Sequence, residues 1–175
     1  GPHIPPILPP LIPSLPCLLS AANALADPHV QAIMQTLTAA NCPPPTIVCT
    51  PSCLSGAAVY NPQNNTITAC GFFSPSLIAH ELIHALQNCP GGQTLKCPPT
   101  LAPVKCQACM EIMAYACSGQ CGPSSAVDKD CLQLGCEMSM TAWCTQYPLK
   151  CAGTTPAQEC SAAIEGGCAN CTGIP

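Results

Sequence analysis

The sequence has no arginine and few charged residues of any kind. Its 175 residues include four lysines and eight acidic side chains, which give a net charge of -4. A nucleic-acid-binding surface needs clustered positive charge to neutralise phosphates, so nucleic acid is not an expected partner. Soluble monomers also use dispersed charges to resist association, so this chain needs another means of staying in solution or of organising itself.

Long apolar runs and the features of a signal peptide are also missing. Prolines interrupt every candidate stretch before it reaches the roughly 18 residues of a membrane span, so no span is expected. The first residues, Gly1-Pro2-His3, contain neither a charged region nor a cleavage site. We therefore interpret Gly1 as the start of a processed chain.

Cysteine, in contrast, is abundant, with eighteen residues in the chain. This enrichment is typical of oxidising compartments, so we expect nine disulfides and a secreted or extracellular location. The pairing of the cysteines cannot be derived from the sequence. The length suits a single domain, which we assign to residues 27–175, preceded by an apolar arm over residues 1–26.

Repeated prolines predict an extended, polyproline-like conformation for residues 2–16 of this arm. We expect an apolar arm to pack against its own domain or a neighbouring copy, so self-association through it is a candidate property. The apolar residues between the prolines, which would make that contact, are Ile4, Ile7, Leu8, Leu11 and Ile12.

Two N-x-T sequons are candidate glycosylation sites. They begin at Asn64 and Asn170. Attached glycans would help to keep a weakly charged chain in solution. One or two such motifs are also expected by chance in a chain of this size, so their occupancy stays open.

Helix signals and short β-favouring runs together predict an α+β fold. Asp27-Pro28 supplies an N-cap and a first-turn proline before apolar residues at helical spacing, and Ser74-Pro75 and Thr155-Pro156 repeat this pattern. Short β-favouring runs between the first two signals predict a small sheet with one hairpin. The predicted helices span residues 27–41, 74–88, 104–118 and 124–145, a further helix begins at residue 155, and the predicted strands span 46–49, 57–60 and 66–70.

An H-E-x-x-H motif on the second of these helices predicts a metal site. His80 and His84 lie four residues apart, so both side chains project from one helix face and can reach the same ion. Glu81 lies about 100° around the helix from His80, where it can act as general base on water without binding the metal. We expect zinc, which in catalytic sites takes three protein ligands and leaves one position open.

The third ligand has to come from outside the motif, and Glu111 on the next predicted helix is the favoured residue. Its neighbours are largely uncharged, so an unpartnered carboxylate there would be costly. The alternative is a glutamate on the helix surface. Asp128, Asp130 and Glu137 are expected to be solvated, and Tyr115 to be either a core residue or a hydrogen-bond donor at the site.

A second metal hypothesis uses cysteines. Cys106 and Cys109 are separated by two residues, as are Cys168 and Cys171, which is a zinc-ligand spacing. In a chain with eighteen cysteines, short spacings are also expected within a disulfide framework. No cysteine has an obvious histidine base, so nucleophilic catalysis is not supported.

Residues 27–171 resemble the mitochondrial inner-membrane metalloproteases that also serve as assembly factors for ATP synthase. The resemblance rests on D-P-H-V-Q-A-I-M from Asp27, on H-E-L-I-H-A from His80, and on C-M-E from Cys109 leading to S-G-Q-C from Ser118. It implies a zincin-like fold with a small sheet and an active-site helix. It also implies Glu81 as catalytic acid and base, with His80, His84 and Glu111 as zinc ligands.

The chain departs from the pattern of this family at three positions. Gln87 and Gln120 stand where the family has acids, and Met113 stands where it has an arginine. Groups around metal ligands change affinity or activity 10–100-fold, so zinc binding with weak catalysis is compatible with these losses. The cysteines and the proline-rich arm suit an extracellular relative.

Two functions follow from these features. The first is a secreted zinc metallopeptidase that hydrolyses peptide or protein substrates with Glu81 as general base. The second is a glycosylated, self-assembling extracellular subunit of a fibril or wall, which keeps a zincin-like fold and uses its arm for contacts between copies.

Overall fold

The computed structural model describes residues 11–53 and 57–175. Over these residues the fold is α+β, with six α-helices, two short 3-10 helices and three strands. In chain order the elements are α1 (Leu11–Ala26), α2 (Pro28–Ala39), β1 (Thr46–Cys49), β2 (Ala58–Asn61), β3 (Thr66–Ala69), α3 (Pro75–Asn88), η1 (Pro90–Leu95), α4 (Pro103–Cys117), α5 (Lys129–Gln146), η2 (Pro148–Cys151) and α6 (Pro156–Glu165).

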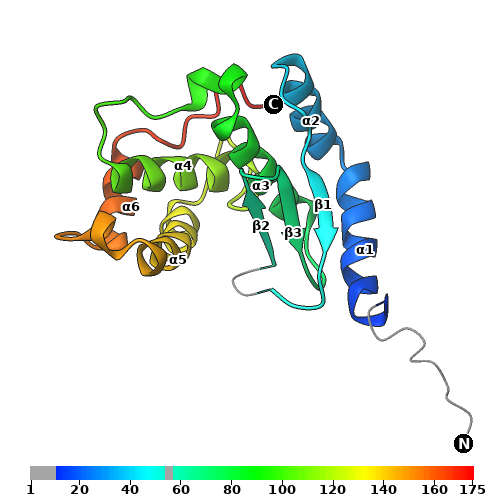
Figure 1. Ribbon diagram of the computed structural model, residues 1–175. Coiled ribbons are helices and arrows are strands. Elements are labelled where there is room, and N and C mark those ends of the chain that lie inside the picture. The colour runs from blue at the N-terminus through cyan, green and yellow to red at the C-terminus, as the bar shows by residue number, and fades with distance from the viewer. Residues whose placement is uncertain (1–10, 54–56) are drawn as a thin grey trace, which may run out of the picture.

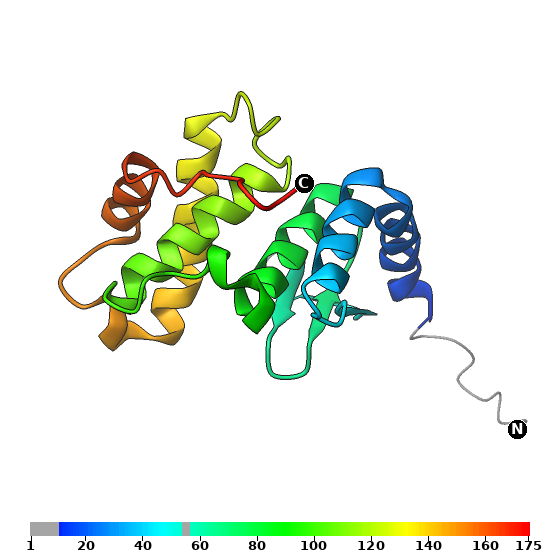
Figure 2. The ribbon, with the colours of Figure 1, turned by 90° about the horizontal axis from the view of Figure 1, so that it is seen from above.

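Helix α3 occupies the centre of the molecule. On one side it contacts α1, α2 and the edge strand β2, and on the other it contacts α4 (Figure 1). Helices α4, α5 and α6 pack against one another to form the second half of the molecule (Figure 2). The sheet has the order β1-β3-β2, in which β3 pairs parallel with β1 and antiparallel with β2.

The capping signals in the sequence mark the starts of three helices. The Asp27 carboxylate accepts hydrogen bonds from two first-turn amides of α2, and the Thr155 hydroxyl accepts one from the amide of Gln158 in α6. Ser74 is the N-cap residue of α3 but makes no side-chain capping bond. The three predicted strands are confirmed within one residue at each end.

The predicted start of α5 is wrong by five residues. The helix begins at Lys129 instead of residue 124, because the Asp128 carboxylate caps it by accepting from the amides of Asp130 and Cys131. The expectation that Asp128 is only solvated therefore misses this role. Asp130 is exposed and Glu137 is half-buried.

The extended conformation expected for residues 2–16 is wrong for residues 11–16, which form the first turns of α1. Pro13 lies in the first turn, where amides lack intrahelical partners, whereas Pro16 lies inside the helix and removes one backbone hydrogen bond; the following Leu- and Ala-rich segment favours helix. Cys17 and Ala24 of this helix are fully buried, so α1 contributes to the core although it lies within the expected arm. Residues 1–10, with Ile4, Ile7 and Leu8, lie outside the described residues.

All eighteen cysteines form disulfides, as the composition predicted. The cysteine metal hypothesis is therefore wrong, because Cys106, Cys109, Cys168 and Cys171 are all oxidised. Three of the bonds involve α4, two of them joining it to the C-terminal segment. The pairs are Cys17–Cys49, Cys42–Cys89, Cys53–Cys70, Cys97–Cys106, Cys109–Cys168, Cys117–Cys171, Cys121–Cys131, Cys136–Cys160 and Cys144–Cys151.

Among residues 11–53 and 57–175, none of the helices combines the length and the hydropathy that a membrane-spanning segment needs. Nine disulfides are typical of a protein that folds in an oxidising compartment, which is consistent with the expected extracellular location.

The long-range disulfides should stabilise the fold more than the short-range ones. The Cys109–Cys168 bond spans 59 residues and Cys144–Cys151 spans 7. Loop-closure entropy predicts that replacing the first pair with alanine lowers the free energy of unfolding by ~4 kcal/mol, and replacing the second by ~2 kcal/mol. Denaturant unfolding of the two double variants measures both values, and equal losses would contradict the expectation.

Candidate metal centre

Three of the predicted site residues converge between α3 and α4. His80 and His84 project from consecutive turns of α3, and Glu111 faces them from α4. The His80 Nε2 atom lies 3.3 Å from Glu111 Oε2, and the His84 Nε2 atom lies 3.1 Å from Glu111 Oε1. The alternative of a surface position for Glu111 is wrong, because only 7% of this residue is exposed.

The other ring nitrogen of each histidine contacts an amide oxygen. His80 Nδ1 lies 2.7 Å from Gln120 Oε1, and His84 Nδ1 lies 2.7 Å from Gln87 Oε1. Because an amide oxygen only accepts hydrogen bonds, each imidazole donates from Nδ1. A neutral imidazole that donates from Nδ1 presents a lone pair at Nε2, toward Glu111 and the other histidine.

The convergence of these atoms fits a bound cation. The Nε2 atoms of His80 and His84 are 3.0 Å apart, so two neutral rings would place their lone pairs against each other. Glu111 Oε2 is buried and accepts no hydrogen bond from the described residues. A proton on one Nε2 atom or a cation between these groups would remove the repulsion, and a cation would also give Glu111 Oε2 a partner; ligand atoms around tetrahedral zinc lie about 3.3 Å apart. Two histidines and one glutamate also form a known set of catalytic zinc ligands.

Glu81 is beside this group but outside it. Its Oε2 atom accepts a hydrogen bond of 2.9 Å from the backbone amide of Tyr60 in β2, so the carboxylate turns toward the sheet edge. Burial raises the pKa of Glu81 above its usual range, although the two histidines and the Tyr60 amide act to lower it. A carboxyl group with a raised pKa is suited to accept and return a proton near neutral pH.

When no metal is bound, His84 and Glu111 strongly shift each other's pKa values. Burial alone would lower the pKa of His84, but the Glu111 carboxylate raises it to about 10. Burial would raise the pKa of Glu111, but the two imidazoles hold it well below its usual range. In the metal-free protein, His84 therefore carries a proton at neutral pH, and a metal ion has to displace it.

Tyr115 supports the site as a packing residue. Its ring meets that of His80 edge-on, with centroids 4.4 Å apart, and its hydroxyl is 3.0 Å from Ser139 Oγ on α5. The close approach of α5 depends on Gly135, because a Cβ there would lie 2.7 Å from the Tyr115 ring. Of the two roles considered for Tyr115, the structure supports the packing role.

The structure places the remaining candidates away from the metal site. His29 lies on α2, where its Nε2 is 2.8 Å from the Pro175 carbonyl oxygen. Asn64 is exposed in the turn between β2 and β3, and Asn170 is exposed near the C-terminus. In each sequon the asparagine Oδ1 accepts a hydrogen bond from the threonine hydroxyl two residues later. Their glycosylation stays a prediction.

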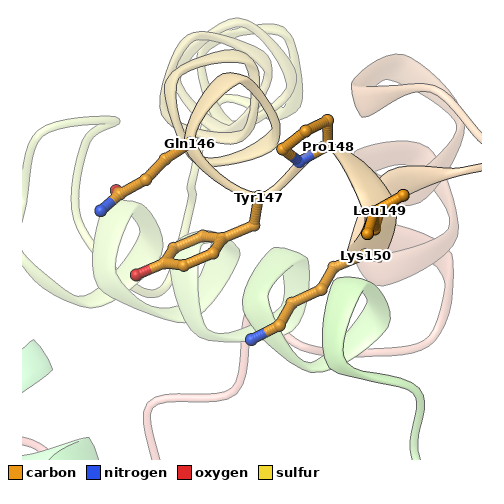
Figure 3. A pocket seen from close by; sticks show the side chains of 5 residues that line it. All are labelled: Gln146, Tyr147, Pro148, Leu149 and Lys150. Carbon is orange, nitrogen blue, oxygen red and sulfur yellow. The ribbon is translucent and has the colours of Figure 1, made fainter.

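A separate pocket lies at the end of α5 (Figure 3). The ammonium group of Lys150 is 4.7 Å from the centre of the Tyr147 ring. The pocket offers neither a histidine nor an acid as a metal ligand. Its lining residues are Gln146, Tyr147, Pro148, Leu149 and Lys150.

From the sequence, Gln87 and Gln120 are identifiable only as positions where the family pattern has acids. Both in fact contact the metal-site histidines, and the signal for this was their fixed distance from H-E-x-x-H and from Ser118-Gly119. Tyr60 and Gly135 were missed, because their contacts with Glu81 and Tyr115 join elements that are distant in the chain.

Comparison of this chain with known protein families, with curated protein sequences and with solved structures finds no match.

The geometry predicts one zinc ion per chain. Elemental analysis after dialysis should find it in the wild type and in His29→Ala, whose histidine lies elsewhere, but not in His84→Ala. The apparent zinc affinity should rise by up to tenfold per pH unit between about pH 6 and 8, since the raised pKa of His84 makes zinc displace a proton throughout this range.

Competition with a chelator at several pH values measures this dependence. A pH-independent affinity would contradict the predicted exchange of a proton for the metal. Equal zinc content in His84→Ala and the wild type would contradict the site itself.

Proposed function

We propose that this protein is a zinc metallopeptidase with a zincin-like fold, in which His80, His84 and Glu111 hold the ion. The observation that carries the proposal is the convergence of both Nε2 atoms and a buried carboxylate, with each Nδ1 bonded to an amide oxygen. Chance histidines in a helix core do not require such an arrangement of hydrogen bonds. The adjacent Glu81 supplies the further group that hydrolysis needs.

Zinc at such a site polarises a carbonyl group and makes water nucleophilic near neutral pH. Glu81 accepts the proton that the attacking water loses and delivers a proton to the leaving amine. The hydrogen bond from the Tyr60 amide holds one oxygen of this carboxylate, which leaves the other oxygen for the proton. Burial of Glu81 favours its protonated form, which helps it to accept the proton from water, and the leaving amine is basic enough to take that proton from it.

The position of strand β2 supports an extended peptide as the substrate. This strand is at the edge of the described sheet, and it borders α3. The Tyr60 amide points to Glu81 on α3 instead of to β3, so the outer edge of β2 faces the site. A peptide that adds to this edge by β-augmentation would pass beside Glu81.

The proposal includes kinship with the mitochondrial metalloprotease and ATP synthase assembly factor family. It is supported by the H-E-L-I-H-A run from His80 and by Glu111 two residues after Cys109. Extracellular location is part of the proposal and rests on the nine disulfides.

Self-assembly as an extracellular structural subunit is the second candidate function, and the outer face of α1 favours it. This helix contains no charged residue, and Leu15, Leu18, Leu19 and Leu25 are each 45–54% exposed. Two copies of this face would meet without like-charge repulsion, although each chain has a net charge of -4. The expected partner is therefore a second copy of the chain, bound through α1.

Glu81→Gln should retain zinc and lose hydrolysis of an unfolded test protein by at least about 100-fold, because only the proton carrier is removed. Glu165→Gln, at an exposed position of α6, is the matched control and should cleave like the wild type. If the wild type and Glu81→Gln both hold zinc and are equally inactive, the metal has a structural role instead.

Leu15→Glu/Leu19→Glu should abolish association of the chain, because it places charge in the apolar face of α1. Leu134→Glu/Met138→Glu adds the same charges at the same spacing on an exposed face of α5 and should leave association unchanged. Light scattering on both variants measures the mass in solution. A monomeric wild type, or equal association of both variants, would remove the support for assembly through α1.

A further inference from the structure

Gln87 accepts one hydrogen bond and donates two in the last turn of α3, where only 3% of the residue is exposed, and the longer donation, of 3.5 Å, is to Met113 Sδ on α4. Its Oε1 atom accepts from His84 Nδ1 at 2.7 Å. Its amide nitrogen donates to the backbone carbonyl oxygen of Met110 on α4 at 3.0 Å. The bond to Met110 fixes the orientation of the amide, since a flipped amide would place its oxygen against a carbonyl oxygen.

These bonds join the two helices that supply the metal ligands. His84 is a ligand on α3, and Met110 directly precedes the ligand Glu111 on α4. One side chain therefore sets the ring orientation of His84 and also fixes the backbone beside Glu111. A residue that only accepts, such as aspartate or glutamate, could make the bond to His84 but not the one to Met110.

Gln120 provides a comparison within the same site. Its Oε1 atom accepts from His80 Nδ1, as Gln87 does from His84, and it is also 3.1 Å from the Ser118 hydroxyl. Both side-chain hydrogen bonds of Gln120 use its oxygen. Its amide nitrogen donates no hydrogen bond to the described residues. At this position an acid could replace the amide without losing a bond to the protein.

We infer that Gln87 is a positioning residue that couples α3 to α4 and sets the distance between the histidine ligands and Glu111, a role that requires an amide. The inference rests on the proposed metal site. It gives Gln87 a role of its own, beyond being a position where the family pattern has an acid. Carboxylate partners raise the basicity of a ligand histidine, so an acid at residue 87 or at residue 120 should strengthen metal binding by that effect alone. Only at residue 87 does the acid also face a carbonyl oxygen in a buried contact.

Gln87→Glu and Gln120→Glu, made in the full chain, separate the two effects. Zinc affinity is measured by chelator competition, and the visible spectrum of the cobalt-substituted protein reports the coordination geometry. Gln120→Glu should bind zinc at least as tightly as the wild type, with an unchanged cobalt spectrum. Gln87→Glu should bind about 10–100-fold more weakly than Gln120→Glu, with an altered spectrum.

Gln87→Met keeps the size of the side chain without a buried charge, so it tests the same role if Gln87→Glu does not fold. It should also bind zinc more weakly than the wild type, while its disulfide content is unchanged. Equal zinc affinities and equal cobalt spectra for Gln87→Glu and Gln120→Glu, or a wild-type affinity in Gln87→Met, would overturn the inference. A wild type that binds no metal would overturn the proposed site itself, whereas metal binding without hydrolysis leaves the role of Gln87 intact.

Discussion

The contact between α3 and α4 at His80, His84 and Glu111 is the constraint on which the other features of the site depend. Two imidazole nitrogens and a carboxylate approach within 3.0–3.3 Å of one another in a buried space. Such a group is stable only if the helices are held at a fixed separation and a proton or a metal ion balances the charges. In the proposed function, a zinc ion is the cation that balances these charges.

The rest of the fold holds α4 in place for this contact. The disulfides of Cys109 and Cys117 fasten it to the C-terminal segment, on both sides of Glu111 in the sequence. Lys105, near its start, pairs with the buried Glu159 of α6 at 3.2 Å. Tyr115 packs between His80 and α5, at a point where Gly135 leaves room for the ring. Few charges are available in this chain, and three of its eight acids are buried at Glu81, Glu111 and Glu159.

The amides around the histidines accept the hydrogen bonds that acids would accept there, and they carry no negative charge. Gln87 and Gln120 still accept from both Nδ1 atoms, so the orientation of the rings is preserved. Neutral partners lack the effect by which a carboxylate partner strengthens metal binding by a histidine. In return, the amide at residue 87 gains a bond to α4 that an acid cannot make.

Local patterns in the sequence determined the strands, most helix starts and the shared helix face of the two candidate ligands in H-E-x-x-H, because caps, prolines and four-residue spacing act within one element. Glu111 could be inferred because an isolated carboxylate among apolar residues needs a partner. Tertiary structure alone decided the pairing of eighteen cysteines and the contacts that Tyr60, Gln87 and Gln120 make with Glu81, Met110 and His80. These depend on distances between elements far apart in the chain, which are set by packing of the whole core and leave no periodic signal in the sequence.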